Sequence, residues 1–245
     1  MNLIDSHFHL TSLAAGWLPS SDLSAGLAVT SQASEWHLAA LTRLTLSANW
    51  RLAVGVHPWY VCSDIDWLEF EQLLREDSSI AIGEIGLDGS YGTPPKGLQF
   101  EVFQRQLSIA QSYGRLLSLH LVNDQEQGYQ LIRSLKGLSG GIVHGFIGSL
   151  IQAKRWQALG FHLGLGPVLL TQLTDKRKEM LRNVNIEMIH LESDAPFRNR
   201  FCQLASPNDL FPYQRILASV LDVSEELLSE QLANNWQQLW SLQKG

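Results

Sequence analysis

Short apolar runs, each bounded by turn-forming residues, recur along the 245 residues of the chain. Most of them lack the alternation of apolar and polar positions that is typical of a strand with one face in water. They therefore predict strands that are covered on both faces, as in parallel sheets, whose successive strands need a crossover connection. The predicted strands lie within residues 3–10, 24–31, 51–58, 79–88, 115–122, 140–146, 161–166 and 188–196.

Longer stretches with helical periodicity fill most of the gaps between these runs. Gly114, Gly137 and Gly160 end three of the stretches, as glycine commonly does at the end of a helix. The predicted helices cover residues 34–49, 66–76, 97–114, 125–137, 149–160, 174–184, 208–222 and 224–240.

The alternation of the two element types predicts an α/β fold. The ends of the predicted strands are 20 to 36 residues apart, close to the roughly 30 residues of a βαβ unit. Eight strands and about eight helices predict a (β/α)8 TIM barrel, and the length suits a single domain over residues 1–245. An open, doubly wound sheet is the alternative, although no G-x-G-x-x-G segment follows the first strand, as it would in a dinucleotide-binding sheet.

Composition and charge narrow the class of protein. With 45% hydrophobic and 17% charged residues, the chain has the composition of a globular protein. It shows neither a signal-peptide pattern nor an apolar run near the roughly 18 residues of a membrane span, so we expect a cytoplasmic protein without a membrane segment. The net charge of −6 provides no general attraction to nucleic acid, so a polyanionic substrate would have to be held locally.

Ionisable residues collect where the predicted strands end, which in a barrel is the side of the active site. His7 and His9 would project to the same face of the first strand. Burial of several such groups together without a cation would leave unpaired charges and lone pairs. The set offers more ligands than one four-coordinate ion requires, so we expect two ions about 3.5–4 Å apart, with Glu84 as the shared carboxylate. The full set is His7, His9, His57, Glu84, His120, His144 and Asp194.

The remaining histidines are expected outside this cluster. His37 falls in a helical stretch, and His162 and His190 fall inside strands, where we expect core histidines. Cys62 and Cys202 are far apart in sequence and are expected to be structural thiols. No G-x-S-x-G elbow and no P-loop occur. Three tryptophans that could stack on a base or pack in the core are Trp17, Trp59 and Trp67.

Seven segments recur in order along the chain: DSHFHL, VGVHPW, IGEIGLD, LQFEVFQRQLSIA, the histidine of LSLHLV, IVHGFIGS and LESDAP. Together they resemble the TatD family of metal-dependent hydrolases, the deoxyribonuclease-like members of the amidohydrolase superfamily. The resemblance spans nearly the whole chain and looks closest to the YjjV branch. It implies that His7 and His9 bind one ion with Asp194, that Glu84 bridges, and that His120 and His144 bind the second ion. It also implies that His57 contacts substrate or phosphate without binding metal.

The leading hypothesis from the resemblance is a phosphodiesterase or deoxyribonuclease that acts on nucleic acid ends through a water activated by two metals. Glu84 and Asp194 are the expected catalytic residues, with Asp194 orienting or deprotonating the water, and Arg198 is an expected substrate contact. Imidazole ligands favour Zn²⁺ or Mn²⁺ over Mg²⁺, which remains a possible ion. Nucleic acid or another phosphodiester is the expected partner, and no obligate protein partner is inferred.

Three positions depart from the family pattern. Val122 stands where the family usually has an arginine, Ile147 replaces a common serine, and Thr11 lies near a frequent acid. Loss of the arginine would remove a bidentate phosphate contact. This supports a second hypothesis, hydrolysis of a small ester, lactone or amide at the same metal site. A third hypothesis is a non-catalytic nucleic-acid-binding or scaffold protein that keeps its ligands for stability.

Overall fold

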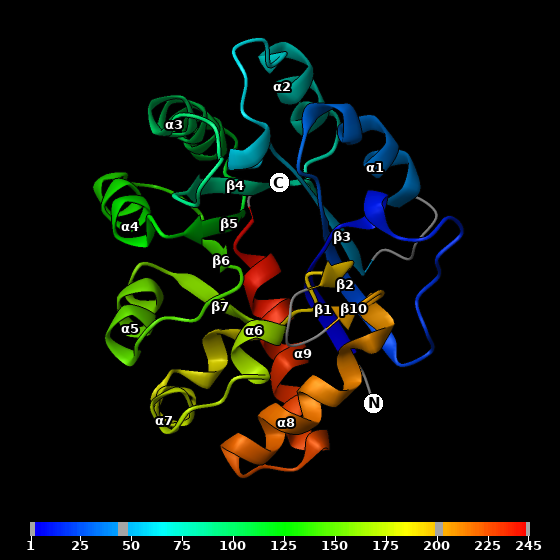
Figure 1. Ribbon diagram of the computed structural model, residues 1–245. Helices are drawn as coiled ribbons and strands as arrows, with labels where there is room; N and C mark the ends of the chain where they lie inside the picture. The colour runs from blue at the N-terminus through cyan, green and yellow to red at the C-terminus, as the bar shows by residue number, and fades with distance from the viewer. Residues whose placement is uncertain (1–2, 44–48, 199–202, 244–245) are drawn as a thin grey trace.

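The computed structural model describes residues 3–43, 49–198 and 203–243. Its main sheet has eight parallel strands in the sequential order β1 to β8, which confirms the predicted (β/α)8 barrel (Figure 1). A doubly wound sheet is excluded because the strand order never reverses. The strands are β1 (Leu3–Phe8), β2 (Leu23–Val29), β3 (Trp50–Val54), β4 (Ala81–Asp88), β5 (Leu117–Val122), β6 (Gly141–Val143), β7 (Phe161–Leu165) and β8 (Ile189–Leu191).

The first and last strands meet beside the predicted ligands. The backbone N–H of Asp194 donates to the carbonyl of His7 at 2.9 Å, and the N–H of His9 donates to the carbonyl of Ala195 at 2.7 Å. These bonds join the end of β1 to the segment just after β8, so the barrel is nearly closed. Closure at this end holds the two segments that carry His7, His9 and Asp194 against each other.

Helices cover the outside of the barrel from β2 onward (Figure 1). The connection from β1 to β2 contains only the short 3-10 helix η1 (Leu10–Ser12), in a stretch for which no helix was predicted. The outer helices are α1 (Trp36–Arg43), α2 (Trp67–Glu76), α3 (Lys96–Tyr113), α4 (Gln125–Ser134), α5 (Leu150–Ala158), the short α6 (Pro167–Leu170), α7 (Asp175–Asn183) and α8 (Phe211–Leu221).

Local sequence signals set several helix ends. The Asp66 carboxylate accepts hydrogen bonds from the N–H groups of Leu68 and Glu69, which fixes the start of α2. Gly114 ends α3 with a φ of 64°, a conformation that glycine adopts without a steric penalty. The predicted helix over 208–222 divides into η5 (Pro207–Leu210) and α8, and part of the predicted helix over 34–49, residues 44–48, lies outside the described residues.

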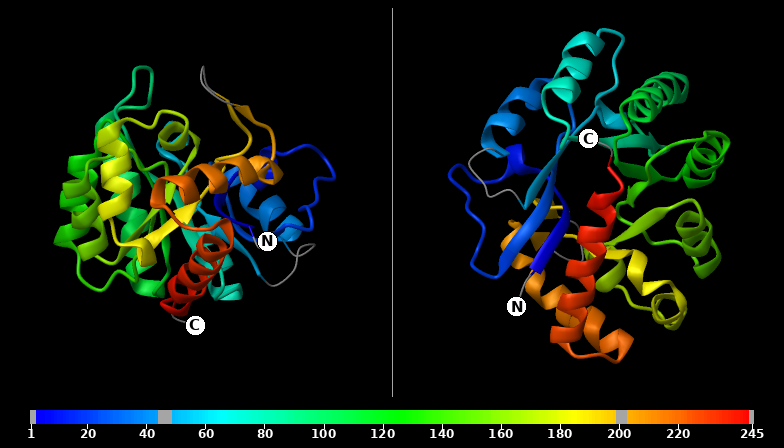
Figure 2. Two further views of the ribbon diagram at one scale, coloured as in Figure 1. Left: turned by 90° about the horizontal axis from the view of Figure 1, so that it is seen from below. Right: turned by 180° about the vertical axis from the view of Figure 1, so that it is seen from behind.

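The last helix, α9 (Glu225–Ser241), closes the amino-terminal end of the barrel. Seen from behind, it crosses the barrel end opposite to the carboxyl ends of the strands (Figure 2, right). Its Trp236 and Leu239 join an apolar cluster with side chains near the starts of the strands, such as Ile4 of β1 and Ala81 of β4. The carboxyl end is left accessible, which is the end where barrels bind their substrates.

The remaining short elements connect this framework. They are η2 (Ala33–Glu35), η3 (Pro58–Tyr60), η4 (Ile186–Met188) and a two-stranded ribbon of β9 (Phe197–Arg198) and β10 (Gln203–Leu204). Among the helices of the described residues, none combines the length and the apolar character that a membrane-spanning segment needs.

His162 and His190 form a buried pair outside the cluster of predicted ligands, as expected for core histidines. His162 Nδ1 lies 2.9 Å from His190 Nε2, and the rings stack beside Trp236. Burial lowers the pKa of His162 to about 4 and holds the pKa of His190 well below its usual range. Both imidazoles are therefore neutral at pH 7, with one donating to the other.

This pair makes the fold sensitive to acid. Because the pKa of each histidine is lower in the folded than in the unfolded chain, its stabilisation is present above pH ~6.5 and is lost as the pH falls toward 4. We expect the His162→Leu, His190→Leu double variant to lose less unfolding free energy between pH 7 and pH 5 than the wild type, by about 2 kcal/mol for His162 alone and by a further amount for His190. Urea unfolding at both pH values measures this difference.

The exposed His37 offers a matched control. Its side chain is 69% exposed on α1, so the variant His37→Gln should keep the wild-type dependence of stability on pH. If the double variant lost stability between pH 7 and pH 5 as steeply as the wild type, ionisable groups other than this histidine pair would cause the acid sensitivity.

Candidate metal centre

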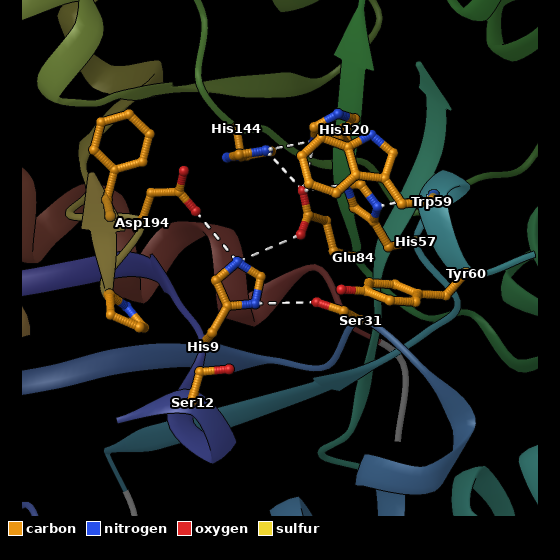
Figure 3. Close-up of a pocket in the computed structure, with 12 residues that line it drawn as sticks. His9, Ser12, Ser31, His57, Trp59, Tyr60, Glu84, His120, His144 and Asp194 are labelled. Carbon is orange, nitrogen blue, oxygen red and sulfur yellow. Dashed lines mark hydrogen bonds and ion pairs between the residues drawn. The ribbon is translucent and has the colours of Figure 1, made fainter. Parts of the chain in front are cut away.

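All predicted ligands meet at the carboxyl end of the barrel. They come from five strands or the residues just after them, and all except the deeper His7 line a cavity of about 380 Å³, together with His57. In Figure 3, dashed lines join the carboxylate of Glu84 to His9 and His144, and join His9 to Asp194. His7 is completely buried next to this cavity. The sequence therefore identified residues that the fold brings together.

Close packing of the strands positions Glu84 and its neighbours. Gly86 follows Glu84 in β4 at a φ of 152°, and a Cβ at this position would overlap the carbonyl oxygen of His120 in β5. Glycine therefore lets the two strands approach each other. Asp194 has a φ of 56°, a conformation that is uncommon but tolerated by aspartate, and its N–H is bonded to His7.

One oxygen of Glu84 faces the imidazoles of β5 and β6. Glu84 Oε1 lies 2.7 Å from His120 Nδ1 and 2.8 Å from His144 Nε2. The two histidine nitrogens are 3.1 Å apart. Each ring therefore directs a nitrogen toward the same carboxylate oxygen.

The other oxygen of Glu84 faces the two histidines at the carboxyl end of β1. Glu84 Oε2 lies 3.7 Å from His7 Nε2 and 3.6 Å from His9 Nε2. Asp194 Oδ1 lies 3.6 Å and 3.3 Å from the same two nitrogens. The Glu84 carboxylate thus stands between two groups of potential metal-binding side chains, one group at each oxygen.

The outer nitrogens of His120 and His144 face buried carboxylates that sequence reasoning missed. Asp88 Oδ2 lies 3.1 Å from His120 Nε2, and Glu192 Oε1 lies 3.6 Å from His144 Nδ1. At hydrogen-bonding distance, as for His120, such a carboxylate keeps the proton on the outer nitrogen and leaves the inner lone pair for a metal. The 3.6 Å at His144 is too long for a hydrogen bond. Asp88 ends the IGEIGLD segment and Glu192 lies in LESDAP, so both were visible in the motifs.

Hydroxyl groups hold the outer nitrogens of the other two predicted ligands. Ser118 Oγ lies 3.0 Å from His7 Nδ1, and Ser31 Oγ lies 3.3 Å from His9 Nδ1. Neither serine was predicted, because nothing in the sequence indicates that residue 118 packs against residue 7. A hydroxyl can donate or accept, so it is compatible with either tautomer of the ring.

The electrostatics of the cluster favour positive charge beside the carboxylates. Burial by itself would raise the pKa of Glu84, but the surrounding imidazoles outweigh burial and hold this pKa well below its usual range. Burial likewise disfavours the charged imidazole of His144, yet Glu84 and Glu192 raise the pKa of this histidine well above its usual value. The pKa values of His120 and His9 are also raised against burial, the first chiefly by Glu84 and the second chiefly by Asp194.

The pKa values of two other histidines are lowered instead of raised. Burial, together with the nearby His144, lowers the pKa of His7. Burial lowers the pKa of His57 to about 3, despite the nearby Glu84. Both imidazoles are therefore neutral at pH 7, and a neutral imidazole is the form that binds metals.

The donor set fits divalent cations. His7 Nε2 is buried and has no hydrogen-bond partner among the described residues, although it faces two carboxylates. Its distances of 3.6 Å or more to their oxygens are too long for hydrogen bonds. A cation would satisfy this lone pair and both carboxylates. Three overlapping groups of side chains meet the distance requirement for a metal: His7, His144 and Asp194; His7, His9 and Glu84; and His57, Glu84 and His120.

Aromatic side chains form the rim of the cavity. Trp59 is 54% exposed, and its indole N–H donates to Asp88 Oδ2 at 2.7 Å. Tyr60 is also exposed, and Tyr60 and Phe197 both line the cavity. Trp17 and Trp67 pack against the core instead. Only Trp59 of the three candidate tryptophans therefore reaches the cavity.

Other sequence expectations have different outcomes. Arg198 belongs to β9, but its side chain and all of Arg200 lie outside the described residues, as does Cys202. Cys62 is exposed, so the expectation of a packed structural thiol is wrong for this residue. Val122 and Ile147 are 37% and 41% exposed, and the described residues that line the cavity include no lysine or arginine.

Comparison with known proteins identifies relatives over most of the chain. The family model described as TatD related DNase matches residues 4–241. The metal-dependent hydrolase YjjV of Escherichia coli K12 is 28% identical over 213 residues, which cover 81% of each chain. The human 3'-5' RNA nuclease TATDN2 is 30% identical over 202 residues, which cover 78% of this chain and 26% of TATDN2. Matches to metal-dependent hydrolases of Bacillus subtilis and Haemophilus influenzae cover 58% and 62% of those proteins.

The fold agrees with these relatives. The crystal structure of YjjV from Escherichia coli K12 superposes with a TM-score of 0.84 over 97% of both chains, at 25% sequence identity. The family match includes every segment on which the resemblance rested and every predicted ligand. The chain therefore belongs to the TatD family and is a metal-dependent hydrolase.

Proposed function

We propose that this protein is a phosphodiesterase that uses two divalent cations to hydrolyse nucleic acid from an end. The observation that carries the proposal is the position of Glu84 between two pairs of histidines that could bind metal ions. Oε2 faces His7 and His9, whereas Oε1 faces His120 and His144. A carboxylate shared in this way is typical of sites that hold two metal ions about 3.5–4 Å apart.

The residues of the chain would divide the chemistry. Glu84 would hold both cations, and Asp194, which faces the cavity, would orient the attacking water and accept its proton. When bound, the cations lower the pKa of water and offset the negative charge that develops on the substrate. This local positive charge would allow a protein with a net charge of −6 to bind a polyanion. Nitrogen donors favour Zn²⁺ or Mn²⁺ over Mg²⁺.

A nucleic acid substrate has two further supports. TATDN2, which is 30% identical to this chain, is a 3'-5' RNA nuclease. Trp59 presents an exposed face beside the cavity, and Asp88 fixes the orientation of its indole. Bases without a pairing partner stack on such side chains with roughly 1–3 kcal/mol per base. An unpaired strand end is thus the nucleic acid form that this rim suits.

A second candidate is hydrolysis of a small ester, lactone or amide at the same site. It is favoured by the absence of lysine and arginine among the described residues that line the cavity. Val122 also offers no phosphate contact at the end of β5. Two bound cations would polarise a carbonyl oxygen as well as a phosphoryl oxygen.

Metal-depleted protein reconstituted separately with Zn²⁺, Mn²⁺ and Mg²⁺ would decide between the candidates. Each form is given single-stranded DNA and RNA labelled at one end, duplexes of the same sequences, and a panel of esters, lactones and amides. We expect metal-dependent shortening of the single strands from one end. Metal uptake with hydrolysis of carbonyl substrates alone would establish the second candidate, and tight nucleic acid binding that is insensitive to chelator would favour a non-catalytic protein.

A further inference from the structure

A second cavity, of about 420 Å³, lies between the start of α2 and the amino-terminal part of α3. It is similar in volume to the cavity at the metal centre and falls in the range of roughly 300–1,000 Å³ that small-molecule sites have. None of its lining residues belongs to the metal centre. Three apolar and three polar side chains of its lining matter for what it can bind: Trp67, Leu98 and Val102, and Cys62, Glu101 and Arg105.

This cavity is on the same side of the barrel as the metal centre. α2 and α3 each begin after the carboxyl end of a strand, β3 and β4, so both starts lie at that end of the barrel (Figure 1). Tyr60 lines the cavity at the metal centre and Cys62 lines the second cavity. The Cα atoms of residues two apart are no more than about 7 Å apart, and a stacked single strand advances about 3.4 Å per nucleotide. A strand that leaves the metal centre past Tyr60 therefore reaches the second cavity within a few nucleotides.

Trp67 and Arg105 offer two stacking surfaces in this cavity. The guanidinium carbon of Arg105 lies 5.9 Å from the centroid of the Trp67 ring. Trp67 packs against the core and meets Phe70 edge-on, which fixes its ring, whereas the Arg105 side chain is 53% exposed and has room to shift. Proteins stack unpaired bases on aromatic rings and on guanidinium planes of this kind.

The charges of the cavity suit a base better than a phosphate group. Arg105 is the one lysine or arginine among the described residues that line either cavity. Its charge is balanced by Glu71, 3.5 Å away, and Glu101 adds a negative charge. Glu101 can accept a hydrogen bond from an N–H group of a base, and Arg105 can donate to an oxygen or ring nitrogen. An uncharged ring with donors and acceptors on its edge therefore fits this lining.

We propose that the second cavity binds a base of the single strand whose end lies at the metal centre, stacked on Trp67 and Arg105. Trp59 at the metal centre and Trp67 in the second cavity then hold two bases of one strand. Aromatic platforms arranged in this way bind unpaired strands without a requirement for sequence. The assignment of the ligand as substrate rests on the proposed nuclease function.

The exposed thiol of Cys62 reports on occupancy of the cavity without any need for activity. In the variant Cys202→Ser it is the only cysteine, and metal-depleted protein leaves the DNA intact. A single-stranded DNA octamer is added at about 1 mM, which exceeds the dissociation constants of roughly 10⁻⁴–10⁻⁶ M of non-specific binding. We expect it to slow modification of Cys62 by a maleimide at least ~fivefold, and a blunt duplex of paired bases to leave the rate unchanged. An unchanged rate with the octamer would overturn the proposal.

Substitutions at Trp67 test the stacking surface in the same assay. Protection of Cys62 should disappear in Trp67→Ala and persist in Trp67→Phe, which keeps an aromatic ring. Leu68→Ala is the matched control, because Leu68 is the next residue of α2, is 79% exposed and does not line the cavity. Full protection in Trp67→Ala would show that no base stacks on this side chain.

Substrate length tests the same site during turnover. We expect the zinc-loaded wild type to prefer the octamer to a dinucleotide in kcat/KM, and this preference to fall about tenfold in Trp67→Ala, within the range for loss of one stacked base. Trp67→Phe and Leu68→Ala should keep it within about twofold. A ratio of two substrates cancels any loss of folded protein, and an unchanged preference in Trp67→Ala would contradict the proposal. If the protein hydrolyses no nucleic acid, the thiol assay still decides whether the cavity binds a base, and only the proposed function fails.

Discussion

The variant Glu84→Gln is expected to lose at least ~10³-fold in kcat, which corresponds to roughly 4 kcal/mol of transition-state stabilisation. Glutamine has nearly the shape of glutamate, but it is uncharged and has one oxygen instead of two. Its NH₂ group would face either His120 and His144 or His7 and His9, where a bound cation would need a negative oxygen. The variant would therefore be unable to hold two cations.

The measurement combines kcat at saturating metal with the zinc content of the purified variant. We expect fewer than two equivalents of zinc together with the loss of activity. Glu69→Gln is a suitable control, because Glu69 lies on α2 and pairs with the exposed His37 at 2.9 Å; its activity should stay within about twofold of wild type. A Glu84→Gln enzyme with more than a tenth of wild-type kcat would show that Glu84 does not bridge the ions.

Removal of metal is expected to lower the melting temperature by at least ~10 °C at pH 8. Free zinc at 1,000 times its dissociation constant stabilises the folded chain by about 4 kcal/mol for each bound ion. Each kcal/mol corresponds to about 2–4 °C in a chain of this size. Differential scanning calorimetry of metal-depleted and zinc-reloaded protein measures the difference, and Glu84→Gln should show a smaller one.

This stabilisation should increase with pH. The carboxylates raise the pKa values of His9, His120 and His144 in the metal-free protein. At low pH these histidines are protonated and stabilise the metal-free fold, and a cation must displace their protons in order to bind. As the pH rises through their pKa values, both effects disappear. The zinc-dependent gain in melting temperature is therefore larger at pH 8 than at pH 6, and equal gains would mean that zinc displaces no protons.

The barrel could be predicted from sequence because its strands are buried on both faces. Runs such as SIAIGEIGLD have few polar positions, and their spacing left little choice besides eight parallel strands joined by crossovers. The crossing of α9 beneath the barrel was not predictable in the same way. It depends on how the closed barrel covers its ends, which local periodicity does not specify.

The sequence by itself indicated which histidines and carboxylates are the predicted ligands of the candidate site. Carboxyl ends of parallel strands meet on one side of a barrel, so polar residues placed there, such as His9, Glu84 and His120, must come together wherever the strands close. Only the tertiary structure decided what each residue faces. Which Glu84 oxygen points to which histidines, and whether an imidazole presents a lone pair or an N–H group, depends on partners such as Ser118 in another strand. Contacts of this kind between distant segments are made by packing and leave no pattern along the chain.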